Sequence, residues 1–285
     1  MRPELHQTLI TEGFGGFTAV PVSGGDINDC LMLVKGKQQY FLKVNESAKF
    51  PEMFAMEYAS LKYLAANTDL KIPEVIHHYA GTTYQWLMLE WIERGYDDKS
   101  YWVSAGEKLA EMHRKTHNSF GWPHSNFIGS LTQLNTAAEN WAEFYSANRL
   151  LPLALKLHDA GLLTGSDIKH IESLCDKLFD LFPDEAPALL HGDLWNGNVM
   201  PSLSSGPCIY DPAVYFGHRE MDIGMTLLFG GFSKEFYDAY QSVYPLREGW
   251  EQRVALTQLY PILVHAVLFG GSYVTAVKNS VKLFL

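Results

Sequence analysis

Three polar side chains at fixed offsets suit the chemistry of phosphoryl transfer. Asn198 follows Asp193 by five residues, and Asp211 comes thirteen residues after Asn198. A phosphate donor carries negative charge that a divalent metal must neutralise, and carboxylate and amide oxygens are suitable protein ligands for Mg²⁺. A further carboxylate can orient the attacking hydroxyl. We therefore expect Asn198 and Asp211 to hold Mg²⁺ and Asp193 to be the catalytic base.

The order of these residues matters more than any one of them. Each alone would be interpreted as structural, because Asp and Asn near Gly commonly form turns and Asp-Pro commonly opens a loop. Together, the His-Gly-Asp triplet at 191–193, Asn198 and Asp211 follow the order of catalytic base, metal-binding Asn and metal-binding Asp in ATP-dependent kinases, with Asp211 expected after a short β-hairpin. The pattern predicts a small-molecule kinase that uses ATP.

An upstream pair fits the same chemistry. Lys43 lies at the end of an apolar strand pattern, Tyr40–Val44, and Glu57 lies in the helix pattern that follows. A lone Lys or Glu ordinarily faces water. Because both precede the 191–198 segment in the order that kinases use, we expect an ion pair between them that holds the phosphates of ATP.

Two further segments are candidates for nucleotide binding. Gly24 and Gly25 join two predicted strands, so their backbone N–H groups could approach phosphate, although Gly-Gly is also an ordinary hairpin turn. The pair is not part of a Walker A loop. Glu90, Trp91 and Ile92 lie where the strand-rich part ends, and their backbone could bind the adenine edge or serve as a plain connector.

The elements that must position these residues change character along the chain. Period-two patterns predict strands over residues 17–22, 29–34, 39–44, 73–78 and 84–92, with a helix from 53 to 64 between them. Helical patterns follow over 103–113, 141–158, 166–182, 222–228 and 250–285 with breaks, and only 188–190 and 207–210 look like strands there. This segregation predicts an α+β bilobal fold.

We expect the boundary between the two lobes near residue 93. The small lobe, residues 1–92, would be a nucleotide-binding β-sheet plus helix. The larger, mainly helical lobe, residues 93–285, would hold the catalytic loop and the substrate-binding helices.

Composition narrows the class of protein. The chain has 285 residues, of which 47% are hydrophobic, so it can fill a substantial core. Its formal charge of −10 argues against a nucleic acid partner, since phosphate backbones are held by clustered Lys and Arg. The sequence shows neither a signal-peptide pattern nor an apolar run of membrane-spanning length, so we expect a cytoplasmic protein without a membrane partner.

The cysteines and histidines do not suggest a metal centre. Cys30, Cys175 and Cys208 are widely spaced, which favours buried reduced thiols over a disulfide framework or a zinc site. Four histidines lie on or near predicted helices without consistent ligand spacing, and surface or capping roles are favoured for them: His113, His117, His158 and His170.

Longer strings resemble the fructosamine kinase family, within the larger group of aminoglycoside phosphotransferase and choline kinase relatives. HGDLWNGN at 191–198 resembles the family's catalytic loop, and DPAVY at 211–215 with GHREMD at 217–222 resembles the segment that follows. Weaker similarity spans the chain and includes FGW at 120–122, NFIG at 126–129, Trp141, Phe144, Arg149, QLY at 258–260 and FGGSY at 269–273.

The resemblance implies a protein-kinase-like fold and transfer of the ATP γ-phosphate to a sugar hydroxyl of a ketosamine. In this family the phosphorylated adduct is unstable, and loss of the sugar phosphate frees the amine, which implies a role in deglycation and protein repair. The substrate would be a small ketosamine or a glycated lysine, and the residues leave both open. They also leave open whether the chain is a monomer or a weak dimer.

The resemblance also suggests roles for residues near the loop. The Trp195 ring could form a wall against which the sugar or amine packs, or could only pack the loop. His218, Arg219 and Glu220 could bind substrate or brace the loop, whereas Asp222 is expected to accept backbone N–H bonds from it. One departure is at Asp26 and Ile27, where several relatives have a small residue or Cys. An acidic group such as Asp26 would be repulsive if it pointed at phosphate.

Two alternatives stand beside the ketosamine kinase. One is a kinase of another hydroxylated small molecule, such as an aminoglycoside or choline, against which the string at 217–220 weighs. The other is a nucleotide-binding pseudokinase, which would be expected to lack one of the four key residues. All four are present: Lys43, Asp193, Asn198 and Asp211.

Overall fold

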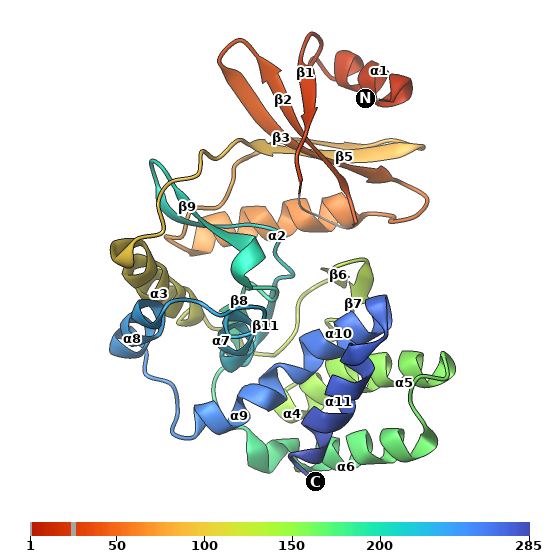
Figure 1. The fold of residues 1–285 in the computed structure, drawn as a ribbon, viewed down its shortest axis with the longest axis vertical. Helices are drawn as coiled ribbons and strands as arrows, with labels where there is room; N and C mark the ends of the chain where they lie inside the picture. The colour runs from red at the N-terminus through yellow and green to blue at the C-terminus, as the bar shows by residue number, and fades with distance from the viewer. Residues whose placement is uncertain (1, 24–26) are drawn as a thin grey trace.

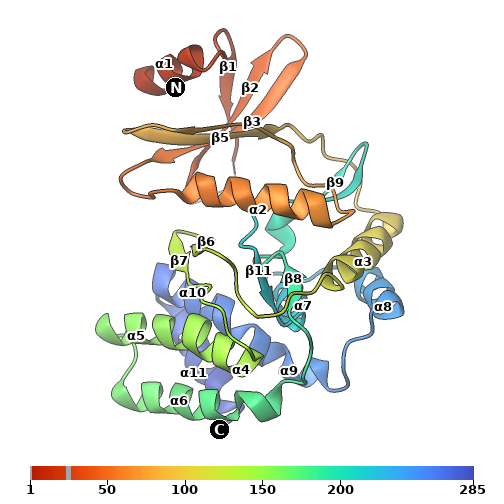
Figure 2. The same ribbon diagram turned by 180° about the vertical axis from the view of Figure 1, so that it is seen from behind.

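The computed structural model describes residues 2–23 and 27–285, so the proposed phosphate-binding Gly24 and Gly25, with Asp26, lie outside the described residues. The N-terminal part is a five-stranded antiparallel sheet in the order β1-β2-β3-β5-β4 (Figures 1 and 2). Its strands are β1 (Thr18–Pro21), β2 (Asp29–Lys35), β3 (Gln38–Glu46), β4 (Val75–Ala80) and β5 (Tyr84–Glu90).

One helix covers each face of this sheet. On one face, Leu5 and Leu9 of α1 (Pro3–Thr11) pack with Trp86 and Met88 of β5. The alternate residues of β5, Leu87 and Leu89, pack in the cluster that includes α2 (Met53–Asn67), so that α2 lies between the sheet and the rest of the molecule (Figure 1). The sequence pattern predicts the five strands and α2, but it does not predict α1.

The rest of the chain is mainly helical, as predicted. It contains α3 (Lys99–His113), α4 (Trp141–Tyr145), the π-helical turn η1 (Ser146–Leu150), α5 (Leu151–Asp159), α6 (Gly165–Leu181), α7 (Glu220–Thr226), α8 (Lys234–Val243), α9 (Trp250–Thr257), α10 (Leu259–Phe269) and α11 (Ser272–Lys282). The helix predicted over 141–158 therefore includes a π turn, and the predicted breaks after 250 fall at Gln258 and at Gly270–Gly271. Helix α8 was not predicted. Within the described ranges, no helix is long and apolar enough to cross a membrane.

Short strands frame the 191–198 segment. β8 (Ala188–Leu190) precedes it and pairs with β11 (Tyr215–Gly217); the 3₁₀ turn η2 (Asn196–Asn198) leads into the hairpin of β9 (Val199–Ser202) and β10 (Gly206–Ile209). A further hairpin joins β6 (Asn126–Ile128) and β7 (Leu131–Gln133). The expectation of only two strands in this half was wrong, because β6, β7, β9 and β11 are also present.

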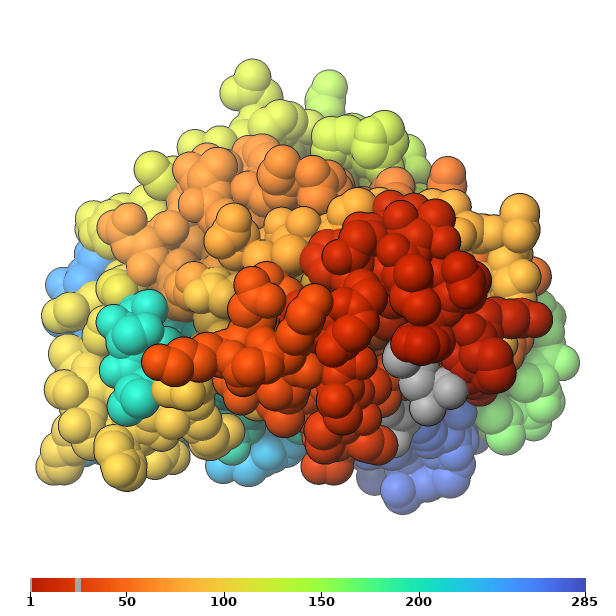
Figure 3. All heavy atoms as spheres, turned by 90° about the horizontal axis from the view of Figure 1, so that it is seen from above, coloured from red at the N-terminus to blue at the C-terminus, as the bar shows by residue number. Residues whose placement is uncertain are grey.

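The β9–β10 hairpin attaches the connector that follows the sheet. The backbone N–H of Gly95 donates to the carbonyl of Pro201 at 2.8 Å, and that of Leu203 donates to the carbonyl of Glu93 at 2.9 Å. In Figure 3 this hairpin (teal) lies at the surface beside the yellow segment that follows β5. The hairpin that carries Asn198 at its start is therefore tied directly to the segment that leaves the sheet.

Helices α3 and α8 pack unusually closely. A Cβ atom at Gly106 of α3 would lie 2.2 Å from the backbone oxygen of Phe236 in α8. Glycine at this position allows the two backbones to approach, and the last residue of α3, His113, thereby reaches Tyr240 of α8.

Candidate active site

A cleft of about 620 Å³ lies between the sheet and the helical part. Its walls come from β3, α2, the segment after β5, the 191–198 loop and the β6–β7 hairpin. Most of the residues singled out from the sequence line it: Lys43, Glu57, Glu90, Trp91, Ile92, Asp193, Trp195, Asn198 and Asp211. The structure therefore brings together residues from three separate stretches of sequence.

Lys43 forms the centre of a buried charge cluster. Its Nζ lies 2.7 Å from Glu57 Oε1 and 2.5 Å from Asp211 Oδ1, and the lysine is only 3% exposed. Burial acts to lower the pKa of Lys43, but the charges of Asp211 and Glu57 outweigh it and raise the pKa above its usual value. Lys43 is therefore a fixed positive charge, and the pair expected with Glu57 is present.

The environment of Glu57 is less favourable for a charged carboxylate. Burial raises its pKa, and although Lys43 acts against this, the negative charge of Asp211 adds to it. Two carboxylates thus share one ammonium group. Removing Asp211 from Lys43, as occurs if Asp211 binds a cation instead, would leave a simple Lys43–Glu57 pair.

Backbone geometry places Asp193 at the mouth of the loop. Gly192 has φ +84°, and a Cβ atom there would lie 2.1 Å from the carbonyl oxygen of Ala213, so the position requires glycine. The buried carboxylate of Asp222 accepts the backbone N–H groups of His191 at 2.7 Å and Gly192 at 2.9 Å. This confirms the expected contact between Asp222 and the loop.

Asp193 and Asn198 face each other across the loop. The Asn198 Nδ2 donates to the Asp193 carbonyl oxygen at 2.9 Å and to its Oδ2 at 3.0 Å. Both bonds use the amide nitrogen, so the amide oxygen of Asn198 is available as a ligand. Burial, followed by the nearby charge of Asp211, raises the pKa of Asp193 to about 7.

This donor set fits Mg²⁺. One carboxylate, Asp211, and one amide oxygen, Asn198, line the cleft together, and Mg²⁺ commonly takes one or two protein oxygens beside water and phosphate. The negative charges of Asp193 and Asp211 repel each other, and a bound divalent cation would reduce this repulsion. Asp211 also adopts φ +57°, which turns it from the hairpin toward Lys43.

At the end of the cleft near the segment after β5, the polar groups of Glu90 already have partners within the protein. The Glu90 N–H donates to the carbonyl of Glu74 at 2.8 Å, and the Glu90 carboxylate pairs with Lys71 at 2.5 Å. These groups of Glu90 are therefore already engaged. Trp91 and Ile92 line this end of the cleft.

An aromatic cluster extends from the 191–198 loop toward α10 and α11. One face of the Trp195 ring lies against Gly197, where an added Cβ would lie 2.3 Å from the ring. The Trp195 and Phe229 rings meet edge to face at a centroid distance of 5.9 Å, and Phe229 meets His265 at 4.8 Å. Phe269 and Tyr273 continue the cluster from His265.

Phe229 and His265 were not among the residues expected at the site. A signal was present for Phe229 alone, because Phe-Gly-Gly occurs twice, at 229–231 and at 269–271. All four glycines have positive φ and open space where a side chain would be, and Phe229 itself has φ +57°. Such backbone at a non-glycine residue marks a position held by its surroundings.

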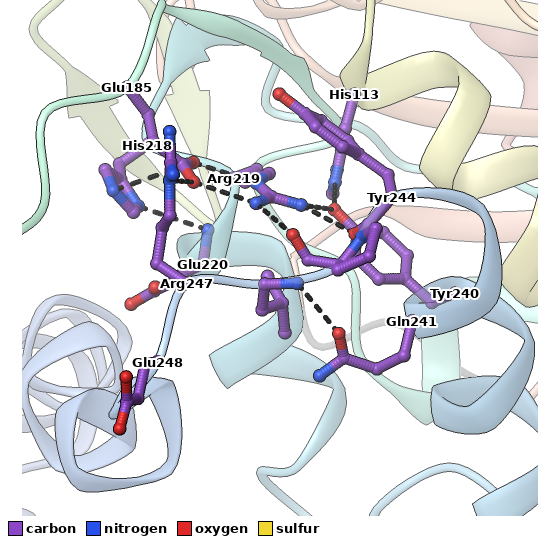
Figure 4. Close-up of polar contacts among 12 residues, drawn as sticks. His113, Glu185, His218, Arg219, Glu220, Tyr240, Gln241, Tyr244, Arg247 and Glu248 are labelled. Carbon is purple, nitrogen blue, oxygen red and sulfur yellow. Dashed lines mark hydrogen bonds and ion pairs between the residues drawn. The ribbon is translucent and has the colours of Figure 1, made fainter.

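His218, Arg219 and Glu220 do not line the cleft. All three are at most 2% exposed, are absent from the lining of the cleft, and lie in a buried polar network (Figure 4). Arg219 forms a two-point ion pair with Glu185, and Glu220 pairs with Arg253 at 2.5 Å. Of the two roles considered from the sequence, this geometry favours bracing over substrate binding.

The remaining cysteine and histidine expectations have different outcomes. The expectation of buried thiols is confirmed for Cys208, whereas Cys30 and Cys175 are only half-buried. Burial raises the pKa of the Cys30 thiol to about 11, which agrees with an unreactive thiol. His113 is fully buried, so the expectation of a surface or capping role is wrong for this residue. It links Asp222 to Tyr240 instead.

Comparisons with known proteins agree with this geometry. The family model described as fructosamine kinase matches residues 4–285. A Synechocystis protein named "Probable ketoamine kinase" is 38% identical over 92% of this chain and 88% of its own length.

Solved structures give the same picture. The crystal structure of a candidate fructosamine-3-kinase from Haemophilus somnus aligns with a TM-score of 0.87 at 27% identity, covering 99% of this chain and 96% of that one. The aminoglycoside phosphotransferase APH(4)-Ia, in a ternary complex with AMP-PNP and hygromycin B, aligns with a TM-score of 0.64 at 15% identity, covering 98% of each chain. The latter likeness shows a shared phosphotransferase fold and confirms the predicted bilobal, kinase-like architecture.

Proposed function

Because the chain belongs to the fructosamine kinase family and is an ATP-dependent kinase of ketosamines, we propose that Asp193 is its catalytic base and that Asn198 and Asp211 are its Mg²⁺ ligands. The observation that carries this assignment is the convergence of these three residues with Lys43 and Glu57 on one cleft. The matching fold of a phosphotransferase bound to AMP-PNP supports ATP in that cleft.

The charge cluster would rearrange when the nucleotide binds. Lys43 now holds both Glu57 and Asp211. With MgATP present, Asp211 would turn to the metal, while Glu57 keeps Lys43 oriented so that its ammonium group reaches the phosphates. Bound Mg²⁺ would supply charge neutralisation on the transferring phosphate. Lys43 and Asp211, which form an ion pair before the nucleotide binds, would then contact the phosphates and the metal separately.

Asp193 would receive the proton of the acceptor hydroxyl. Its carboxylate is fixed by the Asn198 amide at 3.0 Å, which leaves one carboxylate oxygen to face the acceptor. Asp193 would position the hydroxyl in line with the γ-phosphorus and take its proton as the hydroxyl oxygen bonds to phosphorus, while the bond from phosphorus to the β,γ-bridging oxygen breaks and ADP leaves. Orientation and charge stabilisation provide most of the acceleration in such a site.

The aromatic cluster would bind the acceptor. Trp195 lies two residues from Asp193, and Phe229 and His265 extend the surface away from the reacting hydroxyl. A ketosamine has a sugar part with apolar C–H faces and a secondary amine that carries positive charge when protonated. Aromatic rings favour both by packing and by cation–π attraction.

Trp195→Ala is expected to raise the KM for a ketosamine about fivefold, because a stacking or cation–π contact contributes on the order of 1 kcal/mol. The KM for ATP should change by less than twofold. Steady-state kinetics with each substrate varied in turn would measure both. Phe179→Ala is a suitable control, since Phe179 is a 75% exposed aromatic residue on α6. An unchanged ketosamine KM would leave Trp195 with a packing role only.

The substrate is tested with a panel. ADP release is measured on fructosamines and ribulosamines of free amino acids, on glycated lysine within a peptide, and on an aminoglycoside and choline as non-ketosamine hydroxyl acceptors. We expect turnover of ketosamines alone, followed by loss of the sugar phosphate and recovery of the free amine, the deglycation outcome. Equal turnover of choline or the aminoglycoside would contradict the acceptor assignment.

We also propose that residues 1–92 and 93–285 act as nucleotide-binding and catalytic parts. The last strand of the sheet ends at Glu90 and the first helix beyond it begins at Lys99. The connector between them borders the cleft, so a change in its geometry would alter the distance between Lys43 and Asp193.

A further inference from the structure

A row of buried polar side chains runs from the catalytic loop through the helical part of the molecule. It passes from Asp222 on α7 to His113 at the end of α3, to Tyr240 on α8 and to Arg219 before α7. We propose that His113 and Tyr240 are positioning residues, which fix the orientation of Asp222 and through it the catalytic loop. The inference rests on the proposed function, in which Asp193 is the base.

The inner end of this row contacts the loop directly. The Asp222 carboxylate is fully buried and accepts three bonds: two from the backbone N–H groups of His191 and Gly192, and one from His113 Nε2 at 3.2 Å. A buried carboxylate needs such donors, because each unsatisfied oxygen lone pair in this environment is costly. The third donor, His113, determines how the carboxylate is turned toward the loop.

The hydrogen-bond directions along the row follow from the donors. Arg219 can only donate, so its NH1 donates to the Tyr240 hydroxyl oxygen at 3.5 Å. The Tyr240 O–H is then free to donate to His113 Nδ1, which lies 2.8 Å away. With Nδ1 accepting this bond, the N–H of the ring lies on Nε2 and points at Asp222. Tyr240 thus selects the tautomer of His113 that supports Asp222.

The outer end of the row is anchored by an ion pair. Arg219 donates to both Glu185 oxygens at 2.8 Å and to the carbonyl oxygens of Tyr244 and Pro245, just after α8 (Figure 4). Burial acts to raise the pKa of Glu185, but the hydrogen bonds from Arg219 and the surrounding positive charges hold it below its usual value. Glu185 precedes β8, so the pair links the strand that enters the loop to the helix that carries Asp222.

The effect on catalysis comes through backbone geometry. Gly192, whose N–H is held by Asp222, directly precedes Asp193 and adopts a left-handed φ of +84°. A small rotation of the Asp222 carboxylate therefore moves the Asp193 side chain relative to the acceptor hydroxyl. Displacements of an ångström or less in a reacting group are enough to slow a reaction strongly. The nucleotide and acceptor sites themselves are not touched by His113 or Tyr240.

The test removes the Tyr240 hydroxyl and compares it with a matched variant. Tyr240→Phe is expected to lower kcat about tenfold, with the KM values for ATP and for a ketosamine within twofold of the wild type. Tyr237→Phe is the control, because Tyr237 lies on the same helix and its hydroxyl bonds Thr226 Oγ1, outside the row. Thermal unfolding of both variants is measured, since a purely structural role predicts that kcat follows the loss of stability in both alike.

A second pair of variants addresses His113 directly. His113→Gln can place an amide N–H where Nε2–H lies and should retain most of the wild-type kcat, whereas His113→Leu cannot donate and should lose at least tenfold. This pair decides the question even if Tyr240→Phe does not fold. Equal kcat values for Gln and Leu, or equal losses in Tyr240→Phe and Tyr237→Phe, would overturn the positioning role. Absence of ketosamine turnover by the wild type would instead count against the proposed function.

Discussion

Asp193→Asn is expected to lower kcat about 10³-fold while ATP binding is retained. The substitution keeps the size of the side chain, and the Asn oxygen can still accept the bond from the Asn198 amide that Asp193 Oδ2 accepts now. What is lost is the group that takes the hydroxyl proton, and removing a general base typically costs about 10²–10⁴-fold in rate. Because Asp193 is also partly buried and repelled by Asp211, the neutral side chain should not destabilise the fold.

The measurement separates binding from chemistry. MgATP binding is followed by the shift that it causes in the unfolding temperature, and phosphoryl transfer is followed by single-turnover kinetics with a ketosamine. Asp180→Asn is a control for the loss of one negative charge, since Asp180 is exposed on α6. A rate for Asp193→Asn within a few-fold of the wild type would remove Asp193 from the role of base.

The residues of the cleft that the sequence predicted share one property. Each occurs at a position in the chain that matches the order of functional residues in kinases. Asp193, Asn198 and Asp211, for example, follow that order within nineteen residues. Lys43 and Glu57 were predicted as a pair because one lies on a predicted strand and the other on the helix that follows it. Their contact through space, and the additional contact of Lys43 with Asp211 at 2.5 Å, required the structure.

The aromatic cluster could not be predicted in the same way. Phe229 and His265 approach Trp195 from separate helical segments, and nothing in the local pattern of either segment says that they meet. The string at 217–220 shows the opposite difficulty. Its charged residues suggested contact with substrate, whereas Arg219 and Glu220 are buried and paired with Glu185 and Arg253. A sequence string identifies residues that are needed, but burial decides what they are needed for.

The missed elements of the fold have local causes. Strand β9 has only four residues, so a period-two pattern within it is too short to detect. The strand forms because it pairs with β10 and accepts the bond from Gly95 at Pro201. Helix α8 buries Phe236, Ala239 and Tyr240 at helical spacing, but it is short and rich in aromatic and polar residues, which are weaker helix formers than Leu or Ala. Its stability comes from packing on α3 at Gly106.

Because of the charge cluster around Lys43, we expect Asp211→Asn to lower activity without lowering stability. Asp211→Asn is expected to reduce kcat/KM for MgATP at least 10³-fold, because an anionic metal ligand is replaced by a neutral one at the point where phosphate charge must be neutralised. The change is sterically mild. Asp211 has φ +57°, a conformation that Asn tolerates well.

Stability without nucleotide should not fall in the same variant. Asp211 is 41% exposed, so its contact with Lys43 is screened by water, and its charge also acts against the buried carboxylate of Glu57, whose pKa is raised. Asp211→Asn leaves the Lys43–Glu57 pair at 2.7 Å intact and removes that repulsion. We therefore expect an unfolding temperature equal to or above that of the wild type.

The matched variant is Glu57→Gln, which removes the other partner of Lys43. It should lower the unfolding temperature, since the Lys43–Glu57 pair is buried and its loss leaves the ammonium group with only the more exposed Asp211. In titrations with Mg²⁺ and ATP, Glu57→Gln should still show a magnesium-dependent thermal shift, because Asp211 and Asn198 remain, whereas Asp211→Asn should lose it. A magnesium-dependent shift of wild-type size in Asp211→Asn would show that the metal is held elsewhere in the cleft.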